Sequence, residues 1–257
     1  MKGLPRVLMR ALLGGLVVAS MFASVGTASA ASPGWQFGHV TCHGGKIKGG
    51  TYQSLTIAGN CTLTAKGTVH VKGNVVVRGH GILNTLTTGT FNVDGNVSVL
   101  AKGIAGLGCN DEVGCPTESN DHIGGNLTGN DAWAVIVEQE HVGGRISIVG
   151  GGKTKNCSST GLLGGPFFAT VHDSTVGGNV FVSGLRTCWF GLIRTTVGGN
   201  VRVTKNRFGD PDANEIITNT IAGNLSCFNN SPAAQIGDSG GSPNTVGGKK
   251  RGECKNL

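Results

Sequence analysis

The sequence predicts an all-β protein built as a right-handed parallel β-helix of about nine or ten coils. One short motif occurs nine times: an apolar residue, a small or polar residue, Gly, usually Asn, and then alternating apolar positions. Most copies are 19 to 25 residues apart, which is typical of a solenoid. Each unit is rich in Val, Ile, Thr and Gly, and its apolar residues alternate with a period of two. Leucine-rich repeats are disfavoured, because they need a helical segment in each unit and no segment shows apolar residues at helical spacing.

Each motif supplies a strand and a bend. Val97 and Val99 are expected to point inward and Ser98 outward, because side chains alternate along a strand. The Gly-Asn step suits the bend, since both residues tolerate left-handed backbone. Stacking then predicts an asparagine ladder of hydrogen-bonded amides, with a row of binding residues as the alternative. The predicted ladder consists of Asn60, Asn74, Asn96, Asn126, Asn179, Asn200 and Asn224.

Residues 1–30 are predicted to be a cleavable signal peptide. Lys2, Arg6 and Arg10 precede an apolar stretch over 11–23, and the stretch leads to an Ala-Ser-Ala cleavage site at 28–30. The stretch is too short for a membrane-spanning helix, so no stable membrane insertion is expected. Residues 31–257 are predicted to form a single β-helix domain that is secreted, either extracellular or associated with the cell wall.

The charge of the exported chain argues against nucleic acid as a partner. Removing the three cations of residues 1–30 leaves 18 Lys and Arg against 14 Asp and Glu, with no basic stripe interleaved with aromatics. Four cations cluster near the C-terminus, where they form either a solvated end or an attachment to an anionic cell wall. They are Lys249, Lys250, Arg251 and Lys255.

The eight cysteines predict disulfides, because their number is even and export leads to an oxidising compartment. No Cys-x-x-Cys pair is present, which gives zinc and thioredoxin-like chemistry little support. Spacing selects among the connectivities. Cys42 and Cys61 are expected to pair because their spacing places them in adjacent coils at the N-terminal end, and Cys227 and Cys254 because they lie in the last two coils. Cys109 and Cys115 would close a small loop. Cys157 and Cys188 then remain as the fourth pair.

Long spacings mark two insertions, 103–121 and 150–166, and loops on a rigid solenoid commonly carry function. No catalytic residue is predicted. The Gly-His-Gly at 79–81 resembles that of polygalacturonases, but residues 31–93 contain no Asp or Glu and glycoside hydrolysis needs two carboxyl groups. Glu138-Gln-Glu140 is interpreted as an exposed strand edge, and Asp173 as a turn residue.

A calcium site is a hypothesis for Asp210, Asp212 and Asn214, which match positions 1, 3 and 5 of an EF-hand loop. Glu215 replaces the required Gly, and Ile221 stands where the bidentate Glu belongs. No other cofactor is expected.

The Gly-Gly-Asn-Val repeats, the terminal Asn-Thr-Val-Gly-Gly at 244–248 and the Gly-Glu-Cys at 252–254 resemble those of secreted β-helix proteins of actinomycetes. This resemblance covers nearly the whole chain after residue 30 and implies the fold and the location. The repeat also looks like that of bactofilins, cytosolic proteins that polymerise end to end, and the fold resembles that of pectate lyases.

These observations favour a non-enzymatic secreted structural or surface protein, adhesive or bound to a cell-wall or extracellular polysaccharide. One alternative is a polysaccharide lyase or glycoside hydrolase, which requires charged residues to converge on one face. Scattering of Asp131, Glu138, Asp173 and Arg194 over different faces would remove that alternative. An end-to-end polymer is the second alternative.

Overall fold

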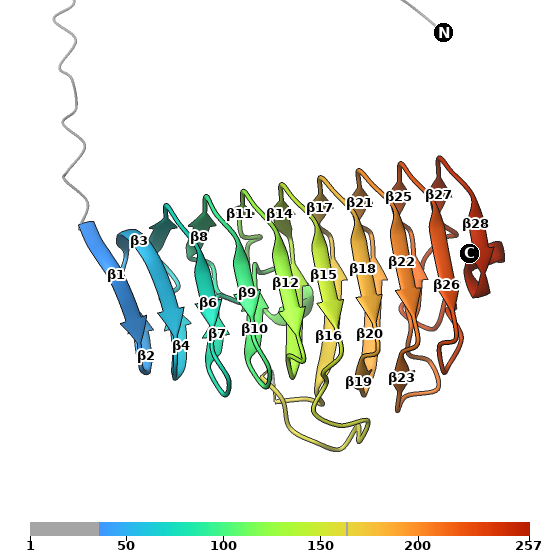
Figure 1. Ribbon diagram of the computed structural model, residues 1–257, viewed down its shortest axis with the longest axis horizontal. Helices are drawn as coiled ribbons and strands as arrows, with labels where there is room; N and C mark the ends of the chain where they lie inside the picture. Colours follow the sequence, from blue (N-terminus) through green and yellow to red (C-terminus); the bar gives the residue numbers. More distant parts are fainter. Residues whose placement is uncertain (1–35, 163) are drawn as a thin grey trace, which may run out of the picture. The chain divides into compact units, whose positions relative to one another are not determined.

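A computed structural model describes residues 36–162 and 164–257, which belong to the unit Gly34–Leu257. Within these residues the chain is a parallel β-helix, as predicted, with coils side by side from β1 to β28 (Figure 1). The predicted signal peptide lies outside the described residues. No helix among the described residues is long and apolar enough to cross a membrane.

Three faces run along the stack, each a ladder of parallel strands. Face 1 takes one strand from each of the ten described coils: β1 (Gln36–Cys42), β3 (Gly50–Ile57), β5 (Thr68–Val71), β8 (Thr90–Val93), β11 (Asp121–Ile123), β14 (Glu140–Val142), β17 (Thr175–Val176), β21 (Thr196–Val197), β25 (Thr220–Ile221) and β27 (Thr245–Val246). Face 2 consists of the C-terminal halves of β1 and β3 with β6 (Val75–Val77), β9 (Val97–Val99), β12 (Leu127–Asn130), β15 (Ile146–Val149), β18 (Val180–Ser183), β22 (Val201–Thr204), β26 (Leu225–Phe228) and β28 (Lys250–Gly252).

Face 3 is a separate sheet. It consists of β2 (Gly45–Ile47), β4 (Asn60–Leu63), β7 (Ile82–Asn84), β10 (Ile104–Leu107), β13 (Ala134–Glu138), β16 (Phe168–His172), β20 (Trp189–Ile193) and β24 (Glu215–Ile217). The remaining elements are a two-stranded pair and two 3₁₀ turns: β19 (Arg186–Thr187), β23 (Arg207–Phe208), η1 (Asp111–Val113) and η2 (Glu253–Asn256).

The core follows from the alternation of side chains in register. Val97 and Val99 are fully buried while Ser98 between them is half-buried. Val97 pairs with Val75 in one neighbouring coil and with Leu127 in the other, so apolar residues stack on apolar residues. Each such side chain contributes about 1.5–3 kcal/mol by its burial. The inward positions form one continuous cluster from Ile47 to Leu257.

An asparagine ladder runs along the bend before face 2. Asn96 donates its backbone N–H and its side-chain amide to Asn74 Oδ1, at 2.9 and 3.2 Å, and Asn126 does the same to Asn96 at 2.8 and 3.1 Å. The same pattern joins Asn179, Asn200 and Asn224. Between the two runs stands Arg145, whose backbone N–H donates to Asn126 Oδ1.

The prediction that Asn60 belongs to this ladder is wrong. Asn60 begins β4 on face 3 and lies opposite Ile82. The register of Leu55 with Val75 gives the ladder position in that coil to Ser54. Only 14 residues separate Asn60 from Asn74, which is too few for a complete coil when other copies of the motif are mostly 19 to 25 apart.

All four predicted disulfides are confirmed: Cys42–Cys61, Cys109–Cys115, Cys157–Cys188 and Cys227–Cys254. The first does not join one column as expected, because Cys42 lies opposite Ile57 at the end of β1 while Cys61 lies in β4. The last ties β26 to η2 at the C-terminal end of the stack. Each closure stabilises the fold by about 2–4 kcal/mol, largely through the unfolded chain.

The corner between face 3 and face 1 positions several charged residues. The chain passes from face 3 to face 1 through single residues with left-handed backbone. Gln139, Asp173 and Arg194 occupy this corner in successive coils, with φ of 51°, 48° and 49°. Since β13, β16 and β20 pair in register, the residues around these corners stack directly on one another.

Candidate functional site

Charged residues from three successive coils and from the first inserted loop, which belongs to the coil before them, meet at the corner between faces 3 and 1. This corner cluster consists of Glu112, Glu138, His172, Asp173 and Arg194. Glu138 and His172 are the last residues of β13 and β16 and are register partners. Asp173 and Arg194 are the corner residues that follow β16 and β20, and Glu112 reaches them from η1 in the first inserted loop.

Two neutral donors fix the carboxylate of Glu138, which is buried. Thr170 donates its hydroxyl to Oε1 at 2.7 Å, and Asn110 donates its side-chain amide to Oε2 at 3.2 Å. Asn110 also caps η1 by accepting the backbone N–H of Val113. The loop that carries Glu112 is therefore tied to face 3 through Asn110 and closed on itself by Cys109–Cys115.

Arg194 forms a bidentate pair with Asp173. Its Nε lies 2.6 Å from Oδ1 and its terminal nitrogen 2.8 Å from Oδ2. The same terminal nitrogen donates to Glu112 Oε1. The hydrogen bonds from Arg194 to Asp173 raise the pKa of the guanidinium, which stays charged.

His172 points its Nδ1 between two carboxylates. The distance is 3.3 Å to Glu112 Oε2 and 3.5 Å to Glu138 Oε2. Its Nε2 is buried without a hydrogen-bond partner, and Trp189 packs perpendicular to the imidazole at 5.7 Å between ring centroids. The corner cluster is thus mostly enclosed, with Glu112 its most exposed carboxylate.

The sequence predicted few of these relations. Glu138, Asp173 and Arg194 converge rather than scatter, while Asp131 lies at a different corner, after face 2. The interpretation of Glu138 and Glu140 as an exposed edge is wrong, because both are buried. They flank the left-handed Gln139, which turns the chain under the inserted loop.

Inside the same corner lies a pair of buried carboxyl groups. Asp121 in β11 is the register partner of Glu140 in β14. Burial raises the pKa of Asp121 to about 7. Hydrogen bonds from the backbone N–H groups of Phe91 and Gly108 lower this pKa, but burial has the larger effect. Burial, and then the charge of Asp121, raise the pKa of Glu140 well above its usual value.

A polar groove of about 600 Å³ lies on the outer side of face 1. We call it the histidine groove. Its walls and floor are formed by Thr68, His70, Asn92, Asp94, Asn120, Asp121, His122 and His141. Four of these residues stack in consecutive coils, since His70 pairs with Asn92, Asn92 with His122, and His122 with His141.

The groove offers hydrogen-bonding groups in a regular row. His70 Nε2 lies 2.8 Å from Asp94 Oδ1, and the rings of His122 and His141 stack with centroids 4.9 Å apart. Asp121 contributes to the wall, but its side chain is buried and Oδ1 accepts the backbone N–H of Phe91 at 2.9 Å. The arrangement can exchange several hydrogen bonds with a polyhydroxylated chain at intervals of about 4.8 Å.

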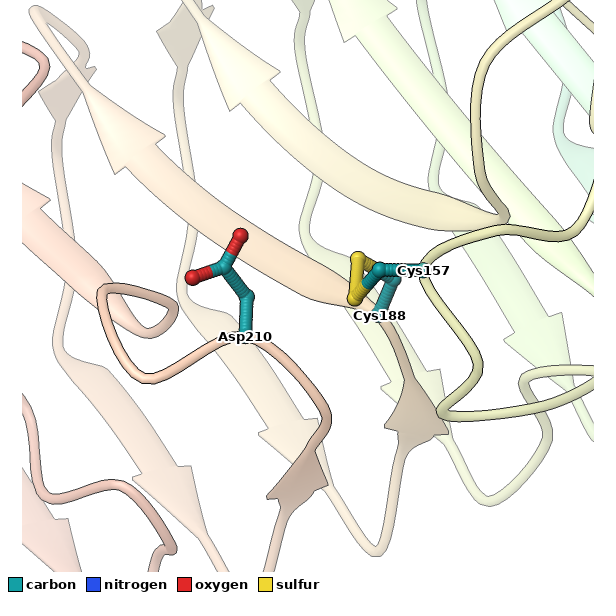
Figure 2. Close-up of side chains that lie close together, drawn as sticks. All are labelled: Cys157, Cys188 and Asp210. Carbon is teal, nitrogen blue, oxygen red and sulfur yellow. A yellow bond between two sulfur atoms is a disulfide. The ribbon is translucent and has the colours of Figure 1, made fainter.

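The residues of the calcium hypothesis lie in one turn. Asp210 Oδ1 accepts the backbone N–H of Asp212 at 3.0 Å, while Asn214 is buried and donates its amide to the carbonyl of Pro232. Calcium at Asp210, Asp212 and Asn214 stays a prediction. Figure 2 shows Asp210 beside Cys157–Cys188, whose sulfur atoms are joined and offer no thiolate to a metal.

The two ends of the stack differ. At the N-terminal end a hollow of about 580 Å³ is lined by Phe37, Ile47 and neighbouring residues. At the C-terminal end η2 covers the last coil, where Cys254 and Leu257 are buried. End-to-end polymerisation would have to join these unlike surfaces.

Comparison with known proteins adds no assignment: no family model, no curated protein and no solved structure matches the chain.

Proposed function

We propose that this is a non-enzymatic secreted protein of the cell surface or extracellular matrix, and that its histidine groove binds a polysaccharide. The observation that carries the proposal is the row of His70, Asn92, His122 and His141 along one open groove of a rigid stack. A repeating ligand suits a repeating row, because each coil can contact a successive part of the chain.

The floor of the groove supports this proposal. It is made of paired strands whose inward residues are fully buried, so its side chains keep their spacing. A prearranged surface loses little conformational freedom on binding. The lining residues carry both donors and acceptors, which sugar hydroxyl groups need.

Four disulfides support the extracellular location, since such bonds persist in oxidising compartments. They agree with the signal peptide predicted for residues 1–30. A stapled stack of this kind suits a protein that must endure outside the cell.

A polysaccharide lyase or glycoside hydrolase is the second candidate, and the convergence of the corner cluster favours it. Its carboxylates, however, are already engaged: Glu138 by Thr170 and Asn110, and Asp173 by Arg194. In the groove, Asp94 is bound to His70 and the Asp121 side chain is buried. A glycosidase needs two carboxyl groups flanking the bond, and this groove presents no such pair among the described residues.

The test is a pull-down of the disulfide-bonded protein with a panel of insoluble polysaccharides and cell walls, with soluble products assayed in the same tubes. Retention without product release supports the proposal. Product release would instead favour the second candidate, and failure to bind any member of a broad panel would contradict both.

A further inference from the structure

We propose that Glu112, Glu138 and His172 form a binding site for a divalent transition-metal ion, with Zn²⁺ the best fit. This site is separate from the histidine groove and does not depend on the proposed function. One ligand atom of each residue, Glu112 Oε2, Glu138 Oε2 and His172 Nδ1, faces the same small space, and such atoms lie within 4.8 Å of one another.

The distances fit a metal better than they fit a hydrogen bond. His172 Nδ1 is 3.3 and 3.5 Å from the two carboxylate oxygens, longer than the about 2.7–2.9 Å of a charge-assisted hydrogen bond. For metal–ligand bonds of about 2.0–2.1 Å, the edge of a tetrahedron is about 3.3–3.4 Å. The two distances from His172 Nδ1 are therefore close to the edges of a tetrahedral site, and the two carboxylate oxygens lie within 4.8 Å of each other.

The surrounding hydrogen bonds orient each carboxylate for this role. Thr170 holds Glu138 Oε1, so that Oε2, which also accepts the side-chain amide of Asn110, faces His172. Arg194 holds Glu112 Oε1 in the same way and turns its Oε2 toward His172. Partners of this kind position metal ligands and tune their affinity.

His172 supplies the second, independent observation. The residue is 7 % exposed, its Nε2 has no hydrogen-bond partner, and its Nδ1 makes only the two long contacts. A buried imidazole without a short hydrogen bond is costly. A metal ion bound to Nδ1 would give that nitrogen the short contact that it lacks.

The charged groups of the corner cluster also favour a divalent cation. The three carboxyl groups of Glu112, Glu138 and Asp173 face one guanidinium, that of Arg194, which leaves an excess of two acidic groups. A divalent cation neutralises this excess. Imidazole with two carboxylates suits Zn²⁺ better than Ca²⁺, which takes six or more oxygen ligands.

Solvent can reach the site at Glu112. The side chain of Glu112 is 45 % exposed, so an ion can enter from the loop side, while Glu138 and His172 are buried. A bound ion would fasten the inserted loop to the corners of two coils. It would also give the site a water ligand, as in metal centres with three protein ligands.

The experiment is equilibrium dialysis of the disulfide-bonded protein against Zn²⁺, with bound metal measured by atomic emission, and with Co²⁺ absorption as a report on tetrahedral geometry. We expect one ion per chain. Glu112→Gln keeps the acceptor for Arg194 but replaces the ligand oxygen, and should weaken binding by more than about tenfold. Thr170→Val, which frees Glu138 Oε1, should weaken it by about tenfold or more.

Two control variants make the result specific. Glu118→Gln changes an exposed carboxylate of the same loop and should leave the affinity unchanged. His122→Ala with His141→Ala, in the histidine groove, should also leave it unchanged. The proposal is overturned if the protein binds no Zn²⁺, if Glu112→Gln binds as tightly as the unaltered protein, or if the groove variant loses the ion.

Discussion

Asp121 and Glu140 lie opposite each other in adjacent coils, with their carboxyl groups buried together inside the stack. Asp121 Oδ2 and both carboxylate oxygens of Glu140 have no hydrogen-bond partner. Two ionised carboxylates would repel each other in this apolar surrounding, so the folded chain holds protons that the unfolded chain releases.

This pair predicts that the protein is more stable in mild acid than in mild alkali. The pKa of Asp121 rises from 3.8 to about 7 on folding, and that of Glu140 rises from 4.5. The contribution of this pair to stability is therefore fully present below the pKa values of the unfolded chain. It is lost as the pH rises through the pKa values of the folded chain. The free energy of unfolding in urea should fall by a few kcal/mol between about pH 4 and about pH 8.

Asp121→Asn tests the cause of this pH dependence. The amide oxygen can still accept from the backbone N–H groups of Phe91 and Gly108, and the like charge beside Glu140 is gone. The variant should lose less stability with rising pH than the unaltered protein. Asp111→Asn, at an exposed position of η1, serves as the control. An unchanged slope in Asp121→Asn would contradict the account.

The asparagine ladder predicts a stability difference between two copies of one motif. Asn96→Ala removes hydrogen bonds to both Asn74 and Asn126, and should cost about 1–2 kcal/mol. Asn60→Ala changes the same motif position outside the ladder and should cost less than about 0.5 kcal/mol. Urea unfolding with an unchanged m-value measures both. Equal losses would show that the ladder itself contributes nothing.

The disulfide Cys109–Cys115 should protect the first inserted loop from proteolysis and have little effect on the stability of the core. Replacing both cysteines by Ser should open cleavage after Glu112 and Glu118 by a Glu-specific protease, while the core still melts cooperatively. The matched variant lacks Cys157–Cys188 and should instead gain tryptic cuts after Lys153 and Lys155. Cleavage of the first loop at the same rate with and without its disulfide would contradict this role.

The repeat made the fold predictable because each copy specifies the same strand and bend. Spacing also identified the disulfide partners, even where the expected geometry differed, as for Cys42 and Cys61. Asn60 shows the limit of reading a motif by itself, since its residues match the ladder motif but its position along the coil does not. The short interval to Asn74 was the signal that could have excluded it.

The corner cluster was harder to predict for a physical reason. Glu138 and His172 are 34 residues apart, and the insertion over 150–166 hides the fact that they are register partners. Glu112 contacts His172 and Arg194 because its loop extends over coils that come later in the chain. The periodicity of the repeat does not predict the path of such a loop. The histidine groove was missed because His70, His122 and His141 look like isolated outward residues until the coils are stacked.

The most direct test of the proposed function compares two variants of face 1 in the polysaccharide pull-down. His122→Ala with His141→Ala removes two stacked residues of the histidine groove, and Thr196→Ala with Thr220→Ala removes two exposed, register-paired residues of the same face outside it. The account predicts that the unaltered protein and the threonine variant are retained while the histidine variant stays in solution, with no soluble products in any tube. Equal retention of the histidine variant would contradict binding in the groove.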